Sequence, residues 1–381
     1  MKTKLTHFFT ALSCLFLSYQ ATAQWTQHSF QFDNVTRNYW LYVPPMYNVS
    51  NPASVVVTLH GMGDNASNFR NIGFNLVADT ANILILVPDA LTDALTSMTA
   101  WNSGAGTMGY YPNSTVNDKG FINAMVDSIV ANYAVNEHQV YICGFSMGGF
   151  MTQKMALQAS NKFAAFASAA GTVGSGTPAV FPGRALPIAH FHGTKDATVG
   201  YNNNMYGISV DSLVNFWVDN NNCNTTPTTT ILPDTQADNY VVTHYLYSGG
   251  DNGSEVELFK VDSAGHEWLT PMNDIFYTVE MWKFFRKHSH QSLSIEKLKA
   301  GDLFEVYPNP AKNELFVEMN EAFNENATIS ITDIHGNLVV SMTNLSNDII
   351  QIPTQDFANG IYFLTVQTKK SSYTKKWILD K

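Results

Sequence analysis

Ser146 lies at the centre of Gly144-Phe145-Ser146-Met147-Gly148, whose spacing is that of a serine nucleophile held in a sharp turn. We expect a buried strand before it, at Gln139–Cys143, and a helix after it, at Met147–Gln158. A strand that turns directly into a helix leaves the serine in a strained conformation, and glycines two positions away on each side avoid a clash. The hydroxyl would face the helix N-terminus, whose partial positive charge favours a developing oxyanion. These residues predict Ser146 as the nucleophile of an acyl transfer.

An activated serine needs a general base, and the base needs an acid to orient it. After a turn of this kind the expected chain order is serine, then aspartate or glutamate, then histidine. Asp196 follows the apolar run Ile188–Phe191, and His266 follows the predicted strand Val256–Val261, so both fall in loops after strands. Asp211 is a weaker candidate because it falls in a predicted helix. We therefore predict that Ser146, Asp196 and His266 form a catalytic triad.

The oxyanion of such a reaction needs two backbone N–H donors. One donor is expected from Met147, directly after the nucleophile, and the other from Met62, in the loop that follows the strand Ser54–Leu59. His60 is expected to brace this loop. The remaining histidines on or beside strands are expected to serve structure, namely His190, His192 and His244.

Aromatic residues are the candidates for the substrate surface. Trp268 stands two residues after His266, and the long segment Leu91–Asn117, rich in Gly, Ser, Thr and Asn, carries Trp101, Tyr110 and Tyr111. Long loops in compact domains are often functional. For each of these rings, packing in the core is the alternative interpretation.

The elements that must position these residues alternate between strands and helices from residue 24 to residue 288. Such alternation predicts a doubly wound, mostly parallel sheet with helices on both faces, an α/β fold. The expected strands are Tyr39–Val43, Ser54–Leu59, Ile83–Val87, Gln139–Cys143, Phe163–Ala169, Pro187–His192 and Val256–Val261. The expected helices are Ala66–Ala81, Gly120–Ala134, Met147–Gln158, Ile208–Asp219 and Asn273–Lys287.

The pattern changes at both ends of this region. Lys2, Lys4, an apolar run and small residues at 21 and 23 predict a signal peptide over residues 1–23. Residues 289–302 are polar and read as a linker. Residues 303–381 show short alternating segments separated by turn residues, which predict a small all-β, immunoglobulin-like sandwich. Its expected strands are Leu315–Glu318, Thr328–Thr332, Leu338–Met342, Ile349–Ile352, Ile361–Gln367 and Tyr373–Leu379.

Composition excludes several classes of protein. Of 381 residues, 45% are hydrophobic and 14% charged, so a large core is expected and global disorder is excluded. The net charge of −10 and the lack of a basic stripe argue against a nucleic-acid partner. Cys143 and Cys223 could form one disulfide after export, but Cys143 falls inside a predicted strand, so we expect free thiols. No cysteine or histidine spacing predicts a metal site.

The first domain resembles secreted polyhydroxybutyrate depolymerases and feruloyl esterases of the α/β-hydrolase type. The resemblance rests on Arg37–Pro44, His60-Gly61, Trp101-Asn102, Asp118–Ile122, Val140–Gly149, His192–Asp196 and Gly265–Trp268. It implies a secreted serine esterase without a cofactor, the same triad, and an aromatic acyl-binding surface that includes Trp101 and Trp268. The sequence departs from the family pattern in two places. Ser248-Gly249 stands where such proteins carry a partner cysteine for Cys223, so we expect the family's disulfide to be missing, and Leu269-Thr270 stands where Pro-Gly is usual, which changes the expected shape of the pocket.

The second domain is similar to C-terminal sorting domains of type IX secretion in Bacteroidota. The matching residues are Val306–Ala311, Ile331–Gly336, Asn359–Leu364 and Lys375–Trp377. The resemblance implies export through that machinery, to the medium or the cell surface, with no catalysis in this domain. A carbohydrate-binding sandwich is the alternative.

Three functions stay open at this point. The first is a carboxylesterase acting on feruloylated polysaccharide or on a polyester, and it is expected to work as a monomer. The second is a serine peptidase on the same fold. The third is a surface binding protein without catalysis, against which the intact triad pattern argues.

Overall fold

The computed structural model describes residues 24–290, 304–319, 328–334, 336–343, 349–367 and 372–381. The chain divides into two compact units, residues 1–290 and 291–381, and each is described by itself. This division falls within the segment 289–302 that the sequence predicts as a linker. The predicted signal peptide, residues 1–23, and residues 291–302 of that linker lie outside the described residues.

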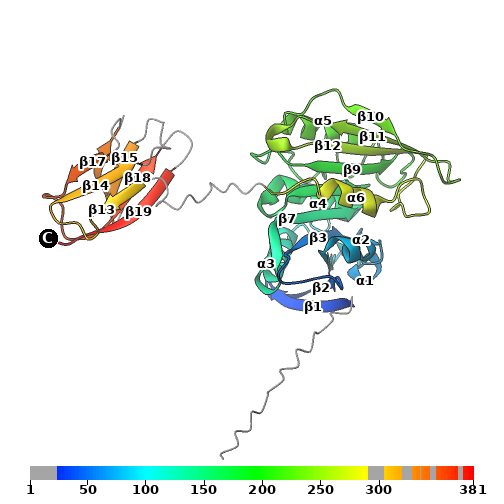
Figure 1. The fold of residues 1–381 in the computed structure, drawn as a ribbon. Coiled ribbons are helices and arrows are strands. Elements are labelled where there is room, and N and C mark those ends of the chain that lie inside the picture. The colour runs from blue at the N-terminus through cyan, green and yellow to red at the C-terminus, as the bar shows by residue number, and fades with distance from the viewer. Residues whose placement is uncertain (1–23, 291–303, 320–327, 335, 344–348, 368–371) are drawn as a thin grey trace, which may run out of the picture. The chain divides into compact units, whose positions relative to one another are not determined.

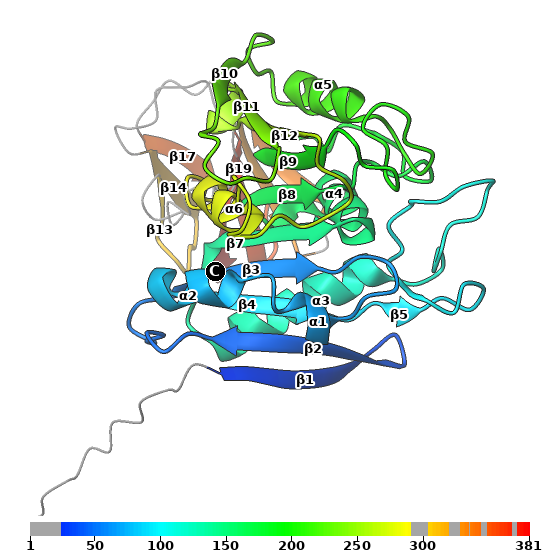
Figure 2. The same cartoon turned by 90° about the vertical axis from the view of Figure 1, so that its right-hand side faces the viewer.

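A ten-stranded sheet runs through the first unit in the order β1-β2-β4-β3-β7-β8-β9-β12-β11-β10 (Figures 1 and 2). The six central strands, from β4 to β12, are parallel, and the two strands at each edge pair antiparallel. The predicted α/β fold with a mostly parallel sheet is confirmed. The strands are β1 (Gln24–Phe32), β2 (Val35–Val43), β3 (Ala53–Leu59), β4 (Ile83–Pro88), β7 (Val135–Phe145), β8 (Ala165–Ala169), β9 (Ile188–Gly193), β10 (Thr228–Ile231), β11 (Val241–Tyr247) and β12 (Val256–Asp262), and a small separate pair comprises β5 (Leu91–Thr92) and β6 (Thr99–Ala100).

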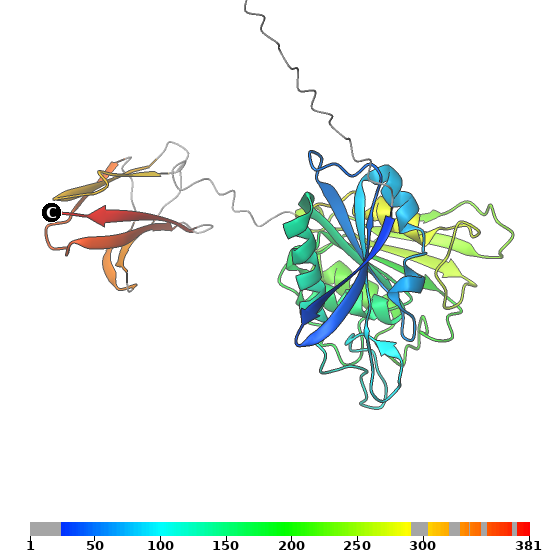
Figure 3. The same ribbon diagram turned by 90° about the horizontal axis from the view of Figure 1, so that it is seen from below.

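Helices cover both faces of this twisted sheet (Figure 3). One apolar core joins α3, α4 and α5 to the sheet, and a second joins α1, α2 and α6 to the opposite face. The central strands β3, β4, β8 and β9 are buried along their whole length, as expected for strands covered on two faces. The helices are α1 (Ala66–Phe69), α2 (Phe74–Ala81), α3 (Asp118–Asn132), α4 (Met147–Gln158), α5 (Val210–Asn220) and α6 (Tyr277–Phe285), with short 3₁₀ turns at Ser160–Lys162 and Asp251–Gly253.

The single helix expected over Ala66–Ala81 is wrong, because Gly73 divides it into α1 and α2. Gly73 has a φ of 95°, a left-handed conformation that only glycine adopts at little cost. The ring of Phe276 also lies over it, since a Cβ there would come within 2.6 Å of the ring. The break therefore has both a local and a tertiary cause.

Three strands of the ten-stranded sheet were not expected from the sequence, namely β1, β10 and β11, and neither was the small pair β5 and β6. Strand β1 forms a hairpin with β2 through Asp33 and Asn34, which have φ values of 50° and 62°. Two left-handed residues give a turn whose twist matches that of the paired strands. This two-residue turn was the signal that could have revealed β1.

The second unit is a sandwich of a three-stranded sheet, β13-β14-β17, and a four-stranded sheet, β16-β15-β18-β19. Side chains of both sheets form one core, in which Leu315 and Val317 of the first sheet join Leu364 and Trp377 of the second. The predicted all-β second domain is confirmed, with one further strand, β13. Its strands are β13 (Phe304–Tyr307), β14 (Glu314–Met319), β15 (Thr328–Asp333), β16 (Leu338–Met342), β17 (Ile349–Pro353), β18 (Gly360–Gln367) and β19 (Ser372–Leu379). Among the residues with a described placement, no helix is long and apolar enough to cross a membrane.

Candidate active site

Ser146 occupies a strained turn between β7 and α4. Its φ of 53° and ψ of −121° lie outside the regions that L-residues ordinarily adopt. The turn needs glycine on both sides: a Cβ on Gly144 would lie 2.3 Å from the backbone of Gly148, and one on Gly148 would lie 2.0 Å from the carbonyl oxygen of Leu59. The Gly-x-Ser-x-Gly spacing thus follows from close backbone contacts, and the strained turn lifts Ser146 above the carboxyl end of β7. We call Gly144–Gly148 the nucleophile elbow.

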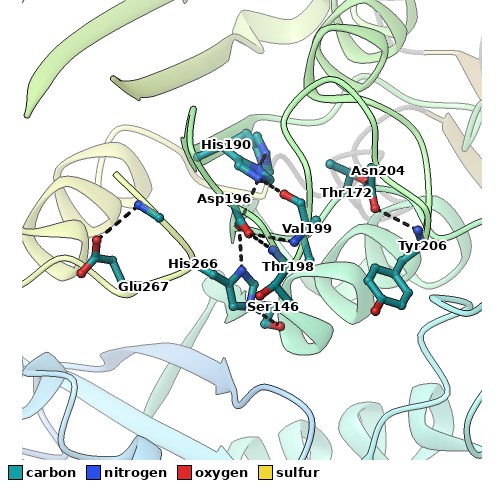
Figure 4. Close-up of polar contacts among 12 residues, drawn as sticks. Ser146, Thr172, His190, Asp196, Thr198, Val199, Asn204, Tyr206, His266 and Glu267 are labelled. Carbon is teal, nitrogen blue, oxygen red and sulfur yellow. Dashed lines mark hydrogen bonds and ion pairs between the residues drawn. The ribbon is translucent and has the colours of Figure 1, made fainter. Parts of the chain in front are cut away.

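The structure brings the three predicted triad side chains together at this edge of the sheet (Figure 4). Nε2 of His266 lies 2.8 Å from Oγ of Ser146, and Nδ1 of His266 lies 2.7 Å from Oδ2 of Asp196. Because a carboxylate only accepts, Nδ1 carries the proton and the lone pair of Nε2 faces the serine hydroxyl. This is the arrangement in which an imidazole can take the proton of a serine.

Asp196 is held as a carboxylate in a buried turn after β9. Its Oδ1 accepts the backbone N–H groups of Thr198, at 2.8 Å, and of Val199, at 2.7 Å. Burial opposes the charge, but the hydrogen bonds from His192, His266 and Val199 outweigh it and hold the pKa of Asp196 well below its usual range. The group that orients His266 therefore stays ionised at neutral pH.

The loop after β3 lies against the nucleophile, as an oxyanion hole requires. A Cβ added to Gly61 would lie 3.3 Å from Cβ of Ser146, so the backbone on either side of Gly61 is close to the serine. Within the described part of the chain, no acceptor is bonded to the backbone N–H of Met62 or of Met147. Met62 and Met147 stay the predicted oxyanion donors.

His60 braces this loop, as expected. Its Nδ1 donates to the carbonyl of Gly61 at 2.7 Å, and its Nε2 accepts the backbone N–H of Ala90 at 3.1 Å. Because one ring nitrogen donates and the other accepts, the ring is neutral, and burial lowers its pKa. The ring links the loop after β3 to the end of β4.

The expected place of Trp101 on the substrate surface is wrong. Trp101 has no exposed surface, and its indole N–H donates to the carbonyl of His60 at 2.9 Å. The indole ring also packs against the imidazole of His60, with 5.2 Å between ring centres. Trp101 therefore supports the loop of Met62 from behind, where a substrate cannot reach it.

Tyr110 and Tyr111 are half-buried, and both hold loops beside the site. The hydroxyl of Tyr110 bonds Asp93, whose carboxylate also accepts the backbone N–H groups of Thr96 and Asn113. The ring of Tyr111 lies within 2.6 Å of where a Cβ on Gly176 would stand. Tyr110 thus closes the 91–113 loop on itself, and Tyr111 packs that loop on the segment around residue 176.

Trp268 is linked to His266 through the ring of Phe145. Its ring meets Phe145 edge-on at 6.3 Å, and Phe145 lies against the imidazole of His266 at 4.8 Å. The indole N–H bonds the hydroxyl of Thr278 at 3.2 Å. The indole is half-buried, so it braces the ring of His266 through Phe145 while one part remains accessible.

The sequence did not reveal the wall on the other side of Ser146, where Figure 4 shows Thr172, Asn204 and Tyr206. Tyr206 is half-buried and packs against a small apolar cluster of Ala105, Phe150 and Val199. Its carbonyl accepts the backbone N–H of Ser175 at 2.9 Å. Three loops far apart in the sequence meet here, and no local sequence motif predicts that they do.

A cavity of about 420 Å³ adjoins the acid of the triad. Its lining includes Asp196, Thr198, Tyr201, Asn203 and the exposed side chain of Met205. Both polar and apolar groups face it. Within the described residues, no three His, Cys, Asp or Glu side chains gather into a group that could hold a metal ion.

Comparison with known proteins gives two family matches, each over part of the chain. Residues 48–206 match the phospholipase/carboxylesterase family, and residues 305–380 match the secretion system C-terminal sorting domain. The first match spans the loop of Met62, the nucleophile elbow and Asp196. The second coincides with the small β-sandwich.

Curated relatives are esterases of several kinds. The chain is 27% identical over 254 residues to a bifunctional acetylxylan esterase/xylanase of Neocallimastix patriciarum, covering 65% of this chain and 33% of that protein. It is 29% identical over 179 residues to a poly(3-hydroxybutyrate) depolymerase of Ralstonia pickettii, covering 42% and 36%. It is 25% identical over 235 residues to feruloyl esterase C of Emericella nidulans, covering 57% and 77%. The chain thus spans only about a third of the length of the first two.

Solved structures with a similar fold include an S-formylglutathione hydrolase from Agrobacterium tumefaciens, at 16% identity and a TM-score of 0.48, covering 71% of this chain and 98% of that one. A ferulic acid esterase from Anaeromyces mucronatus gives 16% identity and a TM-score of 0.47, covering 73% and 97%. The sequence-based resemblance to depolymerases and feruloyl esterases, followed by a sorting domain, is confirmed by the two family matches and the curated relatives.

Proposed function

We propose that the first unit is a serine carboxylic-ester hydrolase that works through an acyl-enzyme on Ser146. The observation that carries this proposal is the continuous chain from Ser146 to His266 to Asp196, with contacts of 2.8 and 2.7 Å. The match of residues 48–206 to a carboxylesterase family and the names of the relatives support ester bonds as the target.

In the first half of the reaction, Oγ of Ser146 attacks the ester carbonyl and Nε2 of His266 takes the serine proton. The imidazolium that forms is stabilised by Asp196, which keeps its charge because its pKa is held low. The new oxyanion accepts from the backbone N–H groups of Met147 and Met62. His266 then gives its proton to the departing alkoxide, which leaves as an alcohol.

In the second half, water replaces the alcohol. His266 takes a proton from the water as it attacks the acyl carbon, and the same two N–H groups stabilise the second oxyanion. The proton returns to Oγ of Ser146 as the acid leaves. The residues thus complete one turnover of an ester and water to an acid and an alcohol.

We propose esters of feruloyl or similar acyl groups on polysaccharide, or polyesters of hydroxy acids, as substrates. The relatives named as acetylxylan esterase, feruloyl esterase and poly(3-hydroxybutyrate) depolymerase support these classes. A panel of methyl ferulate, acetylated xylan and hydroxybutyrate oligomers separates them. A chain with no turnover on any of the three would have another substrate.

We propose that the second unit directs the chain through the type IX secretion machinery, to the medium or the cell surface. The match of residues 305–380 to a secretion sorting domain supports this role. The enzyme itself is proposed to act as a monomer, which size-exclusion chromatography with light scattering would test. A chain without residues 305–380 should stay inside the producing cell.

The central test replaces Ser146 by alanine. Turnover of p-nitrophenyl acetate should fall by about 10⁵-fold or more, because loss of a triad member leaves only the rate due to the oxyanion hole and binding. Ser67→Ala, which changes an exposed serine of α1, is the matched control and should leave turnover unchanged. A fluorophosphonate should label wild-type enzyme at Ser146 and should not label the alanine variant.

The same experiment separates the alternatives. A serine peptidase would be labelled too, but would cleave a peptide panel faster than the ester panel. A binding protein without catalysis would take no label and show the same slow ester turnover in wild type and Ser146→Ala. Either outcome would contradict the esterase proposal.

A further inference from the structure

A row of buried polar side chains runs from α5 to the acid of the triad. His190 and His192 are its centre; both lie on β9, and neither has more than 1% of its surface exposed. The contacts are Trp217 Nε1 to Gln153 Oε1 at 2.8 Å, Gln153 Nε2 to Ser168 Oγ at 2.8 Å, Ser168 Oγ to His190 Nδ1 at 2.7 Å, and His190 Nε2 to His192 Nδ1 at 3.0 Å. None of these groups takes part in the reaction described above.

From the α5 end, the direction of donation is fixed as far as Ser168. An indole N–H only donates, so the oxygen of the Gln153 amide faces Trp217 and its nitrogen donates to Ser168. The hydroxyl of Ser168 accepts this bond and keeps its own proton, which it can donate to Nδ1 of His190. In that case a neutral His190 carries its proton on Nε2, from which it donates to Nδ1 of His192.

The direction at the two histidines follows from the other end of the row. Nε2 of His192 lies 2.8 Å from the carbonyl oxygen of Val199 and 3.4 Å from Oδ2 of Asp196. Both atoms only accept, so Nε2 of His192 carries a proton and Nδ1 is an acceptor. His190 must therefore donate from Nε2 and accept at Nδ1 from Ser168. Complete burial also lowers the pKa of His190, so that ring stays neutral.

We infer that His190 and His192 are positioning residues for Asp196, and that the row donates in one direction from Trp217 to the triad acid. The inference rests on the proposed function. The N–H of His192 is shared between Asp196 and Val199, while the carboxylate of Asp196 accepts the N–H of Val199. The ring of His192 on β9 thus contacts both the carboxylate of Asp196 and Val199, one of the two residues whose N–H groups bind that carboxylate.

This placement gives His192 two effects on His266. It holds Oδ2 of Asp196 where it can accept from His266, and its partial positive N–H draws charge from that oxygen. Other ionisable groups surround the pair: Tyr201 packs on the ring of His192 at 5.7 Å, Tyr277 lies behind Asp196, and Glu267 follows His266 in the chain. Only His192 and His266 bond to Oδ2 among the described residues.

His192→Phe removes the donor but keeps a ring of similar size. We expect kcat for p-nitrophenyl acetate to fall by about 10- to 100-fold with little change in KM, since orientation of the base is lost rather than binding. The acidic limb of the pH profile of kcat/KM should move up by about half a pH unit, because Asp196 then turns more of its charge toward His266.

His192→Gln is the matched conservative variant. Its amide can donate to Asp196 and Val199 and accept from His190, so kcat should return to within about threefold of wild type and the acidic limb should stay in place. Loss of packing alone would lower kcat equally in both variants without moving the limb, and that result would overturn the inference. Wild-type kcat in His192→Phe would also overturn it.

If a variant fails to fold, the positions of the ring protons of His190 and His192 can be measured directly in the wild-type enzyme. Nitrogen NMR of wild-type enzyme labelled with ¹⁵N-histidine should show two rings that hold their proton on Nε2 and accept at Nδ1. A proton on Nδ1 of either ring would overturn the inference. If wild type hydrolyses no ester, the proposed function fails, while this spectrum still tests the direction of the row.

Discussion

A single methyl group placed on Gly148 tests whether backbone packing in the nucleophile elbow sets the position of Ser146. In the folded chain this Cβ would stand 2.0 Å from the carbonyl oxygen and 2.5 Å from the carbonyl carbon of Leu59. Real Cβ atoms essentially never come closer than 3.0 Å to another heavy atom. Both neighbours belong to the backbone of β3, so no side chain can turn aside to make room.

The required movement follows from these distances. Bringing the contact from 2.0 to 3.0 Å means that α4 and β3 must separate by about 1 Å. Gly148 is two residues from Ser146 and one from Met147, so Oγ and one oxyanion donor move with it. A misplacement of about 1 Å costs on the order of 10²-fold in rate, and the strain itself about 1–3 kcal/mol in the free energy of unfolding.

We therefore expect Gly148→Ala to lower kcat/KM for p-nitrophenyl acetate by about 100-fold while the protein remains folded. Gly265→Ala is the matched control: Gly265 precedes His266, yet a Cβ there would meet nothing within 4 Å, so near wild-type turnover is expected. Steady-state rates and thermal unfolding of the two variants give the comparison. Turnover of Gly148→Ala within threefold of wild type would refute this account of the elbow.

Three further predictions concern the surroundings of the site and the division of the chain. Asp93→Asn should raise KM for feruloyl esters about fivefold with little change for acetyl esters, because Tyr110 no longer closes its loop. The Tyr110 hydroxyl and the N–H groups of Thr96 and Asn113 hold the pKa of Asp93 well below its usual range. The ionised Asp93 therefore stabilises the fold above about pH 4, and this stabilisation is lost as the pH falls. On acidification, the urea midpoint of Asp93→Asn should accordingly fall less than that of wild type. A chain ending at His290 should keep its ester turnover, since the bond between the backbone N–H of residue 290 and the carbonyl of His138, at 2.6 Å, is retained; loss of turnover in such a folded chain would show that the second unit takes part in catalysis.

The triad could be predicted from sequence because its chemistry is tied to local backbone demands. A strained serine with glycine on both sides has a fixed local pattern, and parallel strands bring their carboxyl ends to one edge. Asp196 and His266 each follow a strand of that sheet, so only their order along the chain was needed to select them. In the structure, His266 lies within hydrogen-bonding distance of both Ser146 and Asp196.

Trp101 could not be placed in the same way. Its position in a long loop close to the motif residues suggested a substrate contact, yet its indole N–H finds an acceptor at His60, 41 residues earlier. A tryptophan in such a loop can line a pocket or pack in the core, and the choice depends on where the acceptor of its indole N–H lies after folding. No periodicity in the 91–117 segment carries that information, because the segment is neither helix nor strand over most of its length.

The residues around the nucleophile differ in how firmly they are held, and this bears on substrate choice. The wall at Tyr206 is tied to neighbouring loops through backbone bonds, such as that from Ser175 to its carbonyl, and through its apolar cluster. The outer residues Met98, Met108 and Met205 are instead at least half exposed. Methionine side chains are flexible and adapt to different apolar shapes. We therefore expect the fixed wall to define how the reacting ester lies against Ser146, while the flexible methionines adapt to the chain attached to it.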